Sequence, residues 1–254
     1  MHLSHSKMKN QTLPTSFEQC SPKLANFILS VISAADINET TAKFIIWSRI
    51  RKVKVLYRTE YPDVYLADIK GKAQLISAED VALEIRNLNW IFQPLARPWR
   101  PKKIAGRRPL PADLRDIPFG QFLAIQNLFS GYIITKRRDI LAQLINEISS
   151  GWRTCRSVSD RDELALLMWL AAVNNKNAAD FPFLFSSSSE DNSLADDAAP
   201  SPDKIRDSMN AQIRALTKGD ITKEKRILEI SVDRALTELN AIAREAAELK
   251  SKSS

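Results

Sequence analysis

The sequence predicts a mainly α protein: a helical body with one small β-hairpin, an acidic flexible linker and a C-terminal helical module. Three observations predict this class. Apolar residues recur at helical spacing along most of the 254-residue chain. Two short stretches alternate polar and apolar residues, as the strands of a hairpin do. Residues 186–203 are rich in Ser, Asp, Ala and Pro and carry five acids and no base, a composition that cannot bury enough apolar surface to fold.

These observations divide the chain into four segments. We expect a flexible N-terminus over residues 1–20 and a basic, mainly helical body over residues 21–185. A disordered acidic linker over residues 186–203 then leads to a small helical module over residues 204–254. The formal net charge of +7 is uneven, because the linker is acidic and the body carries most of the excess of Lys and Arg.

Capping residues locate the first helices of the body. Ser21, followed by a proline, and Asn38 are good N-caps for two helices, and Ser77 begins a variant capping box for a third that runs as far as residue 92. Between the second and third helices, the alternation over 53–57 and 63–69 predicts the hairpin.

The second half of the body repeats the helical pattern. Pro118 starts a helix that Gly131 ends, another covers the apolar positions of 134–148, and Asp160 caps a helix that runs through Val173. The C-terminal module contains three short helices. The last of them carries an apolar stripe of Val232, Leu236, Leu239, Ile242, Ala243, Ala246 and Leu249.

Several classes of function are disfavoured by composition. Both histidines, His2 and His5, lie in the first five residues, and the two cysteines, Cys20 and Cys155, are far apart. A His-based triad or a Cys/His metal site is therefore not expected. The six glycines form neither a GxGxxG nor a GxxxxGK[ST] phosphate loop. We expect a soluble, intracellular protein that is not an enzyme, with no catalytic residue, no metal and no cofactor.

The strongest charge feature is the segment from Pro94 to Arg108, which has no acid. It belongs to a stretch, residues 94–117, in which prolines exclude a regular helix and predict an extended arm or ordered loop. Its cations can neutralise phosphates and its Trp99 can stack on a base, as in nucleic-acid binding. The alternatives are contact with an acidic protein surface, or a solvated arm. A second acid-free run, residues 41–59, has the pattern of an amphipathic element with long basic side chains; the alternative is a basic face that it forms together with the arm.

Two short motifs carry a resemblance. Leu13-Pro14-Thr15-Ser16-Phe17 precedes the first helix, and Ile117-Pro118-Phe119-Gly120-Gln121-Phe122 begins a later one. Together with residues 210–224 and 235–241, they resemble landmarks of tail assembly chaperones and small structural or adaptor proteins of tailed bacteriophages and prophages. The basic, proline-rich arm departs from that family, in which a plainer strand pair is expected.

The resemblance implies a non-enzymatic protein of virion assembly in the cytoplasm of the bacterial host. Such a chaperone binds the helical tape-measure protein, helps to recruit tail-tube subunits and can self-associate, without contact to a membrane. Nucleic-acid binding through residues 94–108 is the alternative function. The residues predicted to contact a partner are Arg97, Trp99, Arg100, Lys102, Lys103, Arg107, Arg108, Phe119, Phe122, Leu236, Leu239 and Ile242.

Overall fold

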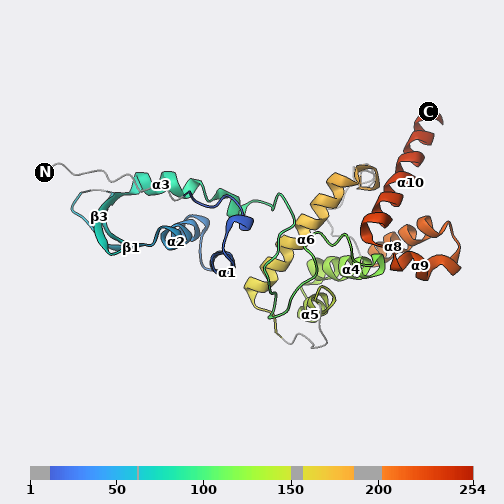
Figure 1. Cartoon of the computed structure of the whole chain (residues 1–254), viewed down its shortest axis with the longest axis horizontal. Coiled ribbons are helices and arrows are strands. Elements are labelled where there is room, and N and C mark those ends of the chain that lie inside the picture. Colours follow the sequence, from blue (N-terminus) through green and yellow to red (C-terminus); the bar gives the residue numbers. More distant parts are fainter. Residues whose placement is uncertain (1–11, 62, 150–156, 186–201, 254) are drawn as a thin grey trace. The chain divides into compact units, whose positions relative to one another are not determined.

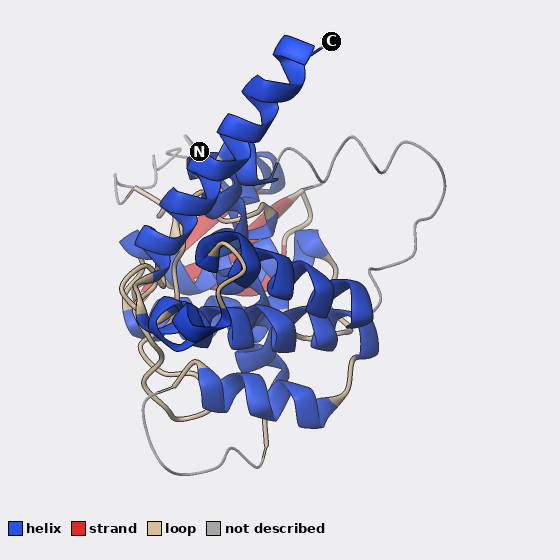
Figure 2. Ribbon diagram, turned by 90° about the vertical axis from the view of Figure 1, so that its right-hand side faces the viewer, coloured by secondary structure: helices blue, strands red, loops and turns tan. Residues whose placement is uncertain are grey.

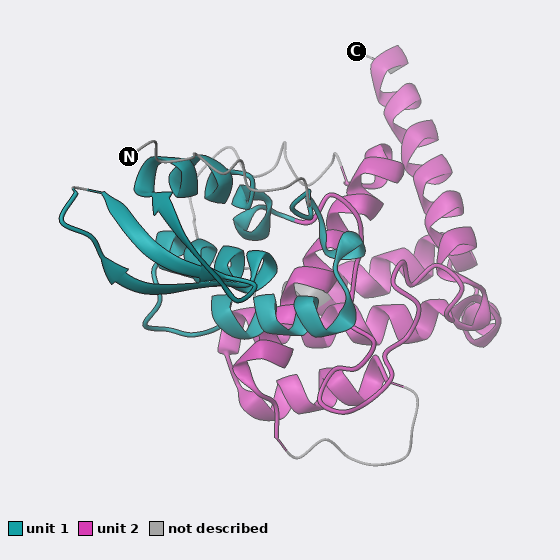
Figure 3. Ribbon diagram, turned by 60° about the vertical axis from the view of Figure 1, so that its left-hand side comes forward, with its two compact units in different colours: residues 1–94 teal, residues 95–254 magenta. Residues whose placement is uncertain are grey.

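The structure, a computed structural model, describes residues 12–61, 63–149, 157–185 and 202–253. It is mainly helical with one small antiparallel sheet, as the sequence predicts (Figure 2). The chain forms two compact units, unit 1 over residues 1–94 and unit 2 over residues 95–254 (Figure 3). This division differs from the expected one, because the boundary falls inside the expected body and the C-terminal helices belong to unit 2.

Unit 1 places two helices before a sheet and one after it (Figure 1). Its elements are η1 (Phe17–Gln19), α1 (Pro22–Ile32), α2 (Glu39–Arg51), β1 (Val53–Arg58), β2 (Val64–Ile69), β3 (Lys72–Ser77), α3 (Ala78–Arg86) and η2 (Asn89–Phe92).

The three predicted N-caps of unit 1 are confirmed. The side chains of Ser21, Asn38 and Ser77 each accept a hydrogen bond from the backbone N–H three residues on, at 3.2, 2.9 and 3.0 Å. Each cap satisfies one of the N–H groups that a helix start leaves without a partner. Helix α3 nevertheless ends at Arg86, earlier than expected, and residues 89–92 form a 3-10 turn instead.

The predicted hairpin is confirmed as β1 and β2, but a third strand, β3, was missed. Strand β2 pairs antiparallel with both neighbours, which gives the order β1-β2-β3. Strand β3 follows β2 after a tight turn in which Lys70 and Gly71 have positive φ values of 55° and 83°. It is as long as β1 and β2, but the adjacent Leu75 and Ile76 interrupt its alternation, so residues 72–77 do not stand out as a strand in the sequence.

The core of unit 1 includes part of the segment expected to be flexible. Within residues 12–20, Phe17 is buried and its ring meets the Trp90 ring edge-on, with centroids 5.1 Å apart. The expectation of a flexible N-terminus is therefore wrong for this part, because a buried aromatic ring ties it to the unit. His2 and His5 lie outside the described residues.

A carboxylate links two helices of unit 1. Glu84 of α3 accepts hydrogen bonds from the Trp47 indole at 2.6 Å and from two nitrogens of Arg51 at 2.8 and 3.0 Å. Lys43 bonds to Asn89 at 2.7 Å and forms an ion pair with Glu39. Two cations of the basic run 41–59, Lys43 and Arg51, thus bind acceptors within the fold.

Unit 2 contains the remaining helices and the proline-rich stretch. Its elements are α4 (Phe119–Thr135), α5 (Arg138–Glu147), α6 (Asp160–Asp180), α8 (Pro202–Thr217), η3 (Ile221–Lys223), α9 (Glu224–Glu229) and α10 (Val232–Ser253). Residues 95–117 contain no helix, as predicted. Most of the expected linker, residues 186–201, and the second cysteine, Cys155, lie outside the described residues.

Three helix boundaries in unit 2 differ from the predicted ones, and one of them is the start of α5 at Arg138 in place of residue 134. Helix α4 continues through Gly131 as far as Thr135 and ends where Lys136 adopts a left-handed conformation, with φ 53°. Tyr132, just past the glycine, is buried and extends the apolar face of the helix, so packing outweighs the local preference of one glycine. Helix α6 is capped by Ser159, whose hydroxyl accepts from the N–H of Asp162 at 3.2 Å, and not by Asp160.

The C-terminal helices share one hydrophobic core with the rest of unit 2. Val232, Ala235, Leu236 and Leu239 of α10 are buried in the same cluster as Phe119, Leu144 and Trp169. Backbone hydrogen bonds also join the two parts: Phe119 N–H donates to the Ile230 carbonyl at 2.8 Å, and Val232 N–H to the Ile117 carbonyl at 3.0 Å. The expectation of a separate module over residues 204–254 is therefore wrong.

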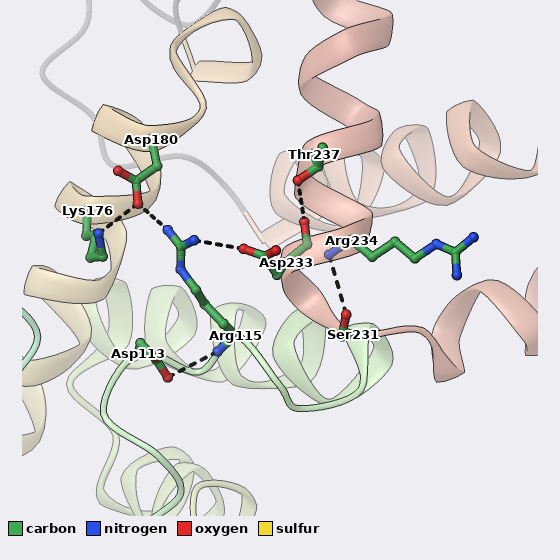
Figure 4. Close-up of polar contacts among 8 residues, drawn as sticks. All are labelled: Asp113, Arg115, Lys176, Asp180, Ser231, Asp233, Arg234 and Thr237. Carbon is green, nitrogen blue, oxygen red and sulfur yellow. Dashed lines mark hydrogen bonds and ion pairs between the residues drawn. The ribbon is translucent and has the colours of Figure 1, made fainter.

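An arginine before α4 connects α6 with α10. The Arg115 guanidinium donates to Asp233 at 2.7 Å and also pairs with Asp180, which accepts from Lys176 at 2.8 Å (Figure 4). These cations lower the pKa of the Asp180 carboxyl: hydrogen bonding from Lys176 is the largest cause, and the charge of Arg115 adds to it. Because Arg115 sits between carboxylates of two helices, it fixes the start of α10 relative to the end of α6.

Candidate nucleic-acid interface

Residues 95–110, called here the basic segment, form an ordered loop of unit 2. Ile104 is completely buried, and Pro101 and Pro109 are buried as well. Ile104 and Arg107 exchange two backbone hydrogen bonds of 2.9 Å around a two-residue turn. Both turn residues, Ala105 and Gly106, have positive φ values of 47° and 78°, which is the geometry of a tight hairpin turn. The segment is thus anchored at several points along its length.

Two arginines of the basic segment, Arg100 and Arg107, donate hydrogen bonds within unit 2. The Arg100 guanidinium donates to the carbonyl oxygens of Leu110 and Pro101 and lies 5.9 Å from the centre of the Trp169 ring. Burial, together with the charge of Arg108, lowers the pKa of Arg100. An arginine nevertheless stays protonated at neutral pH, so the positive charge remains.

Arg107 connects the basic segment to α5. Its Nη1 donates to Asn146 Oδ1 at 2.8 Å, and its Nη2 is buried without an acceptor among the described residues. Backbone pairing of Pro109 with Ser149 holds the same edge of the segment, with Leu110 N–H donating to the Ile148 carbonyl at 2.8 Å. Arg107 is therefore positioned by the fold and is half-buried.

The remaining cations of the basic segment face solvent. Arg97, Lys102, Lys103 and Arg108 are exposed. Within the described part of the chain, no carboxylate forms an ion pair with Arg97, Lys102 or Lys103. Among the described residues, no acidic side chain therefore neutralises these three charges, and the backbone that carries them is held in place. Trp99 is half-buried, so only part of its indole is available to a base.

The predicted apolar contact residues lie elsewhere. Phe119, Phe122, Leu236 and Leu239 are between 0 and 5% exposed and belong to the core of unit 2. Ile242 is half-buried. Helical periodicity predicted apolar faces correctly, but the covering surface is the chain itself, so the first four residues cannot touch a partner in the folded unit.

An apolar row on the sheet of unit 1 was missed. The strand register places Tyr57 opposite Leu66 and Leu66 opposite Leu75, so these three side chains share one face. Tyr57 is 60% exposed and Leu75 is 40% exposed. The signal that could have revealed this row is the short polar–apolar alternation over residues 72–75, at the start of β3.

The described residues provide little for catalysis or metal binding. No group of three or more His, Cys, Asp or Glu side chains is close enough to hold a metal ion in that part of the chain. One open depression lies beside η3 and α9, lined by Ile221, Glu224, Lys225, Leu228 and Glu229. Across the described ranges, no helix combines the length and the apolar character that a membrane crossing requires.

Comparison with known proteins finds no similar protein. No protein-family model matches the chain, and neither the curated proteins nor the solved structures contain a match. Fold and site together define a mainly helical protein of two units that displays an ordered, cationic surface loop.

Proposed function

We propose that the protein binds nucleic acid through the phosphate backbone, with the basic segment as the contact surface. The observation that supports this most directly is the separation of roles within the segment. Arg100 and Arg107 use their donors to hold the loop, whereas Arg97, Lys102 and Lys103 point their charge at solvent. Cations on an ordered loop lose less conformational freedom on binding than those on a flexible arm.

The geometry favours contacts that do not depend on base sequence. The exposed groups are charged side chains on a loop, and phosphate contacts of this kind position a protein without reading bases. If Arg97, Lys102 and Lys103 each neutralise one phosphate, affinity for duplex DNA falls about 40-fold between about 50 and 200 mM salt, from a slope of about 0.9 per contact.

The test is fluorescence anisotropy with labelled single- and double-stranded DNA of about 20 nucleotides, titrated at several salt concentrations. The charge-reversal variant combines Arg97→Glu, Lys102→Glu and Lys103→Glu. We expect it to lose at least about ten-fold in affinity at low salt and most of the salt dependence.

The matched control changes the same net charge within the same unit. It combines Lys218→Glu, Lys225→Glu and Arg226→Glu, all of which are exposed. We expect the control to bind nearly as well as the unchanged protein. Equal losses in both variants would show that only overall charge matters, and no binding by the unchanged protein at low salt would refute the proposal outright.

We propose as a second candidate the role that the resemblance implies, a tail assembly protein that covers a partner's amphipathic helix. The observation that favours it is the row of Tyr57, Leu66 and Leu75, in which Tyr57 and Leu75 are exposed and Leu66 is half-buried, since apolar side chains on an open sheet face are suited to such a partner. Genes for tail-tube and very long helical proteins beside this one would support the same role.

Salt separates the two candidates. Binding of a synthetic amphipathic helix to an apolar face changes little with salt, unlike binding to phosphate. We expect Tyr57→Glu and Leu75→Glu to abolish binding of the helix. The control Lys72→Glu, at an exposed position of the same sheet, should leave helix binding unchanged. Binding that survives both apolar substitutions would exclude this face.

A further inference from the structure

Helix α10 carries an apolar stripe that the protein covers only in part. The stripe follows the alternating three- and four-residue spacing of a coiled-coil seam through Val232, Ala235, Leu239, Ile242, Ala246 and Leu249. In Figures 1 and 2 the helix extends beyond α8 and α9 toward the C-terminus. Alternating steps of three and four residues form a seven-residue repeat, which favours left-handed pairing with another helix.

The first half of the stripe is buried and held firmly. Val232, Ala235 and Leu239 are at most 3% exposed. Arg115 binds Asp233 at the start of the helix (Figure 4), and Asn240 Oδ1 accepts backbone hydrogen bonds from Phe183 and Leu184 at 3.0 and 3.1 Å. The helix is therefore oriented by unit 2 as far as about its middle.

The second half of the stripe faces solvent. Every residue from 244 to 252 is exposed, and Leu249 is 69% exposed. A helix of this length is costly to maintain without packing, because most helical stability in proteins comes from an apolar face covered by another element. The same face that meets the core in the first half is thus left uncovered in the second.

The charges beside the exposed stripe are complementary to those of a second copy. With Leu239 and Ala246 at the first apolar position of each heptad and Ile242 and Leu249 at the second, Glu245 and Lys250 fall at the two flanking positions. In a parallel, in-register pair, Glu245 of one chain lies next to the partner's Lys250, and two-fold symmetry repeats this contact. Arg244 lies on the outer face, where it pairs with Glu248 at 3.7 Å.

We propose that the exposed half of α10 pairs in parallel with α10 of a second copy of this chain. Ile242, Ala246 and Leu249 form the apolar layers, and the two Glu245–Lys250 contacts fix the register. The association is independent of nucleic-acid binding. Because the interface is short, it is weak, and assembly is detectable only at micromolar concentrations or above.

The test is sedimentation velocity of the full chain without nucleic acid over a range of concentrations. We expect concentration-dependent dimers that Leu249→Asp removes. Glu245→Lys and Lys250→Glu should each weaken dimers about ten-fold or more, because each places like charges together, and the double variant should restore them. An equimolar mixture of the two single variants should also pair.

The control is Arg244→Glu, which makes the same charge change as Lys250→Glu on the same helix but outside the seam. It should leave dimerisation nearly unchanged, and circular dichroism should show equal helix content in all variants. A chain that stays monomeric at all concentrations overturns the proposal. The proposal is also overturned if the double variant Glu245→Lys with Lys250→Glu fails to restore dimers. The same holds if Arg244→Glu weakens dimers as much as Lys250→Glu does, or if Lys252→Glu restores the dimers of Glu245→Lys as well as Lys250→Glu does.

Discussion

Replacing Leu239 by Ala tests whether the C-terminal helix belongs to the core of unit 2. Leu239 is 3% exposed and packs in the cluster that contains Trp169 and Phe119. Truncating a buried leucine removes its transfer energy and leaves a cavity, at a cost of about 2–5 kcal/mol. For a unit of this size, about 2–4 °C of melting temperature is lost per kcal/mol, so we expect a decrease of about 4–20 °C.

The same helix provides the matched control. Leu249→Ala makes an identical change ten residues later, where the side chain is 69% exposed. It should change stability by less than about 0.5 kcal/mol, because little apolar surface is covered there and alanine favours helix slightly more than leucine. Thermal unfolding is followed by far-ultraviolet circular dichroism at a dilution at which the chain is monomeric.

The comparison of the two variants decides the argument. A large decrease for Leu239→Ala with none for Leu249→Ala shows that residues 232–239 stabilise unit 2. Equal melting temperatures for the two variants would refute it, since they would mean that α10 contributes no packing and that residues 204–254 form an independent module after all.

Three further predictions concern unit 1. Glu84→Ala removes the acceptor that the Arg51 guanidinium and the Trp47 indole N–H share, so we expect the free energy of unfolding in urea to fall by about 2–4 kcal/mol. The control Glu60→Ala, at an exposed position, should change it hardly at all, and a small loss for Glu84→Ala would contradict the network. Lys52 ends α2 in a left-handed conformation with φ 56°, so Lys52→Gly should raise stability by about 0.5–1 kcal/mol, and a decrease would argue against that geometry. Burial, with the charge of Glu18, raises the pKa of Cys20 from 9.0 to about 11. The thiolate fraction at neutral pH is therefore about 100-fold smaller, and alkylation by iodoacetamide should accelerate up to about pH 11; a plateau near pH 9 would show an ordinary thiol.

The sequence predicted helix starts and helix-free stretches correctly where the deciding interactions lie within a few residues. The caps at Ser21, Asn38 and Ser77 were predicted and confirmed because the cap and the N–H that it accepts are three residues apart. The absence of helix over residues 95–117 was equally predictable, since proline removes the necessary donor within its own residue. Strand β3 escaped notice because its identity depends on pairing with β2 more than on its own six residues.

The apolar residues show the limit of periodicity. Phe119, Phe122, Leu236 and Leu239 were predicted to contact a partner, and the fold buries all four. An apolar stripe predicts that one face of a helix packs against another element, but it does not predict whether that element belongs to the same chain or to a partner. On α10 both outcomes occur along one stripe, because the core of unit 2 covers Leu239, whereas Leu249 is exposed.

The basic segment divides in the same way. Composition alone establishes that residues 94–108 are cationic, because charge is a property of each residue and adds along the chain. Composition does not distinguish Arg100, whose donors are bound by backbone carbonyls, from Lys102, which faces solvent. That distinction depends in part on Trp169, which lies against Arg100, as the anchoring of Arg107 depends on Asn146; both residues lie far along the chain and meet the segment only after folding. Residue types therefore decide how much charge is present, and long-range packing decides which charges are left for another molecule.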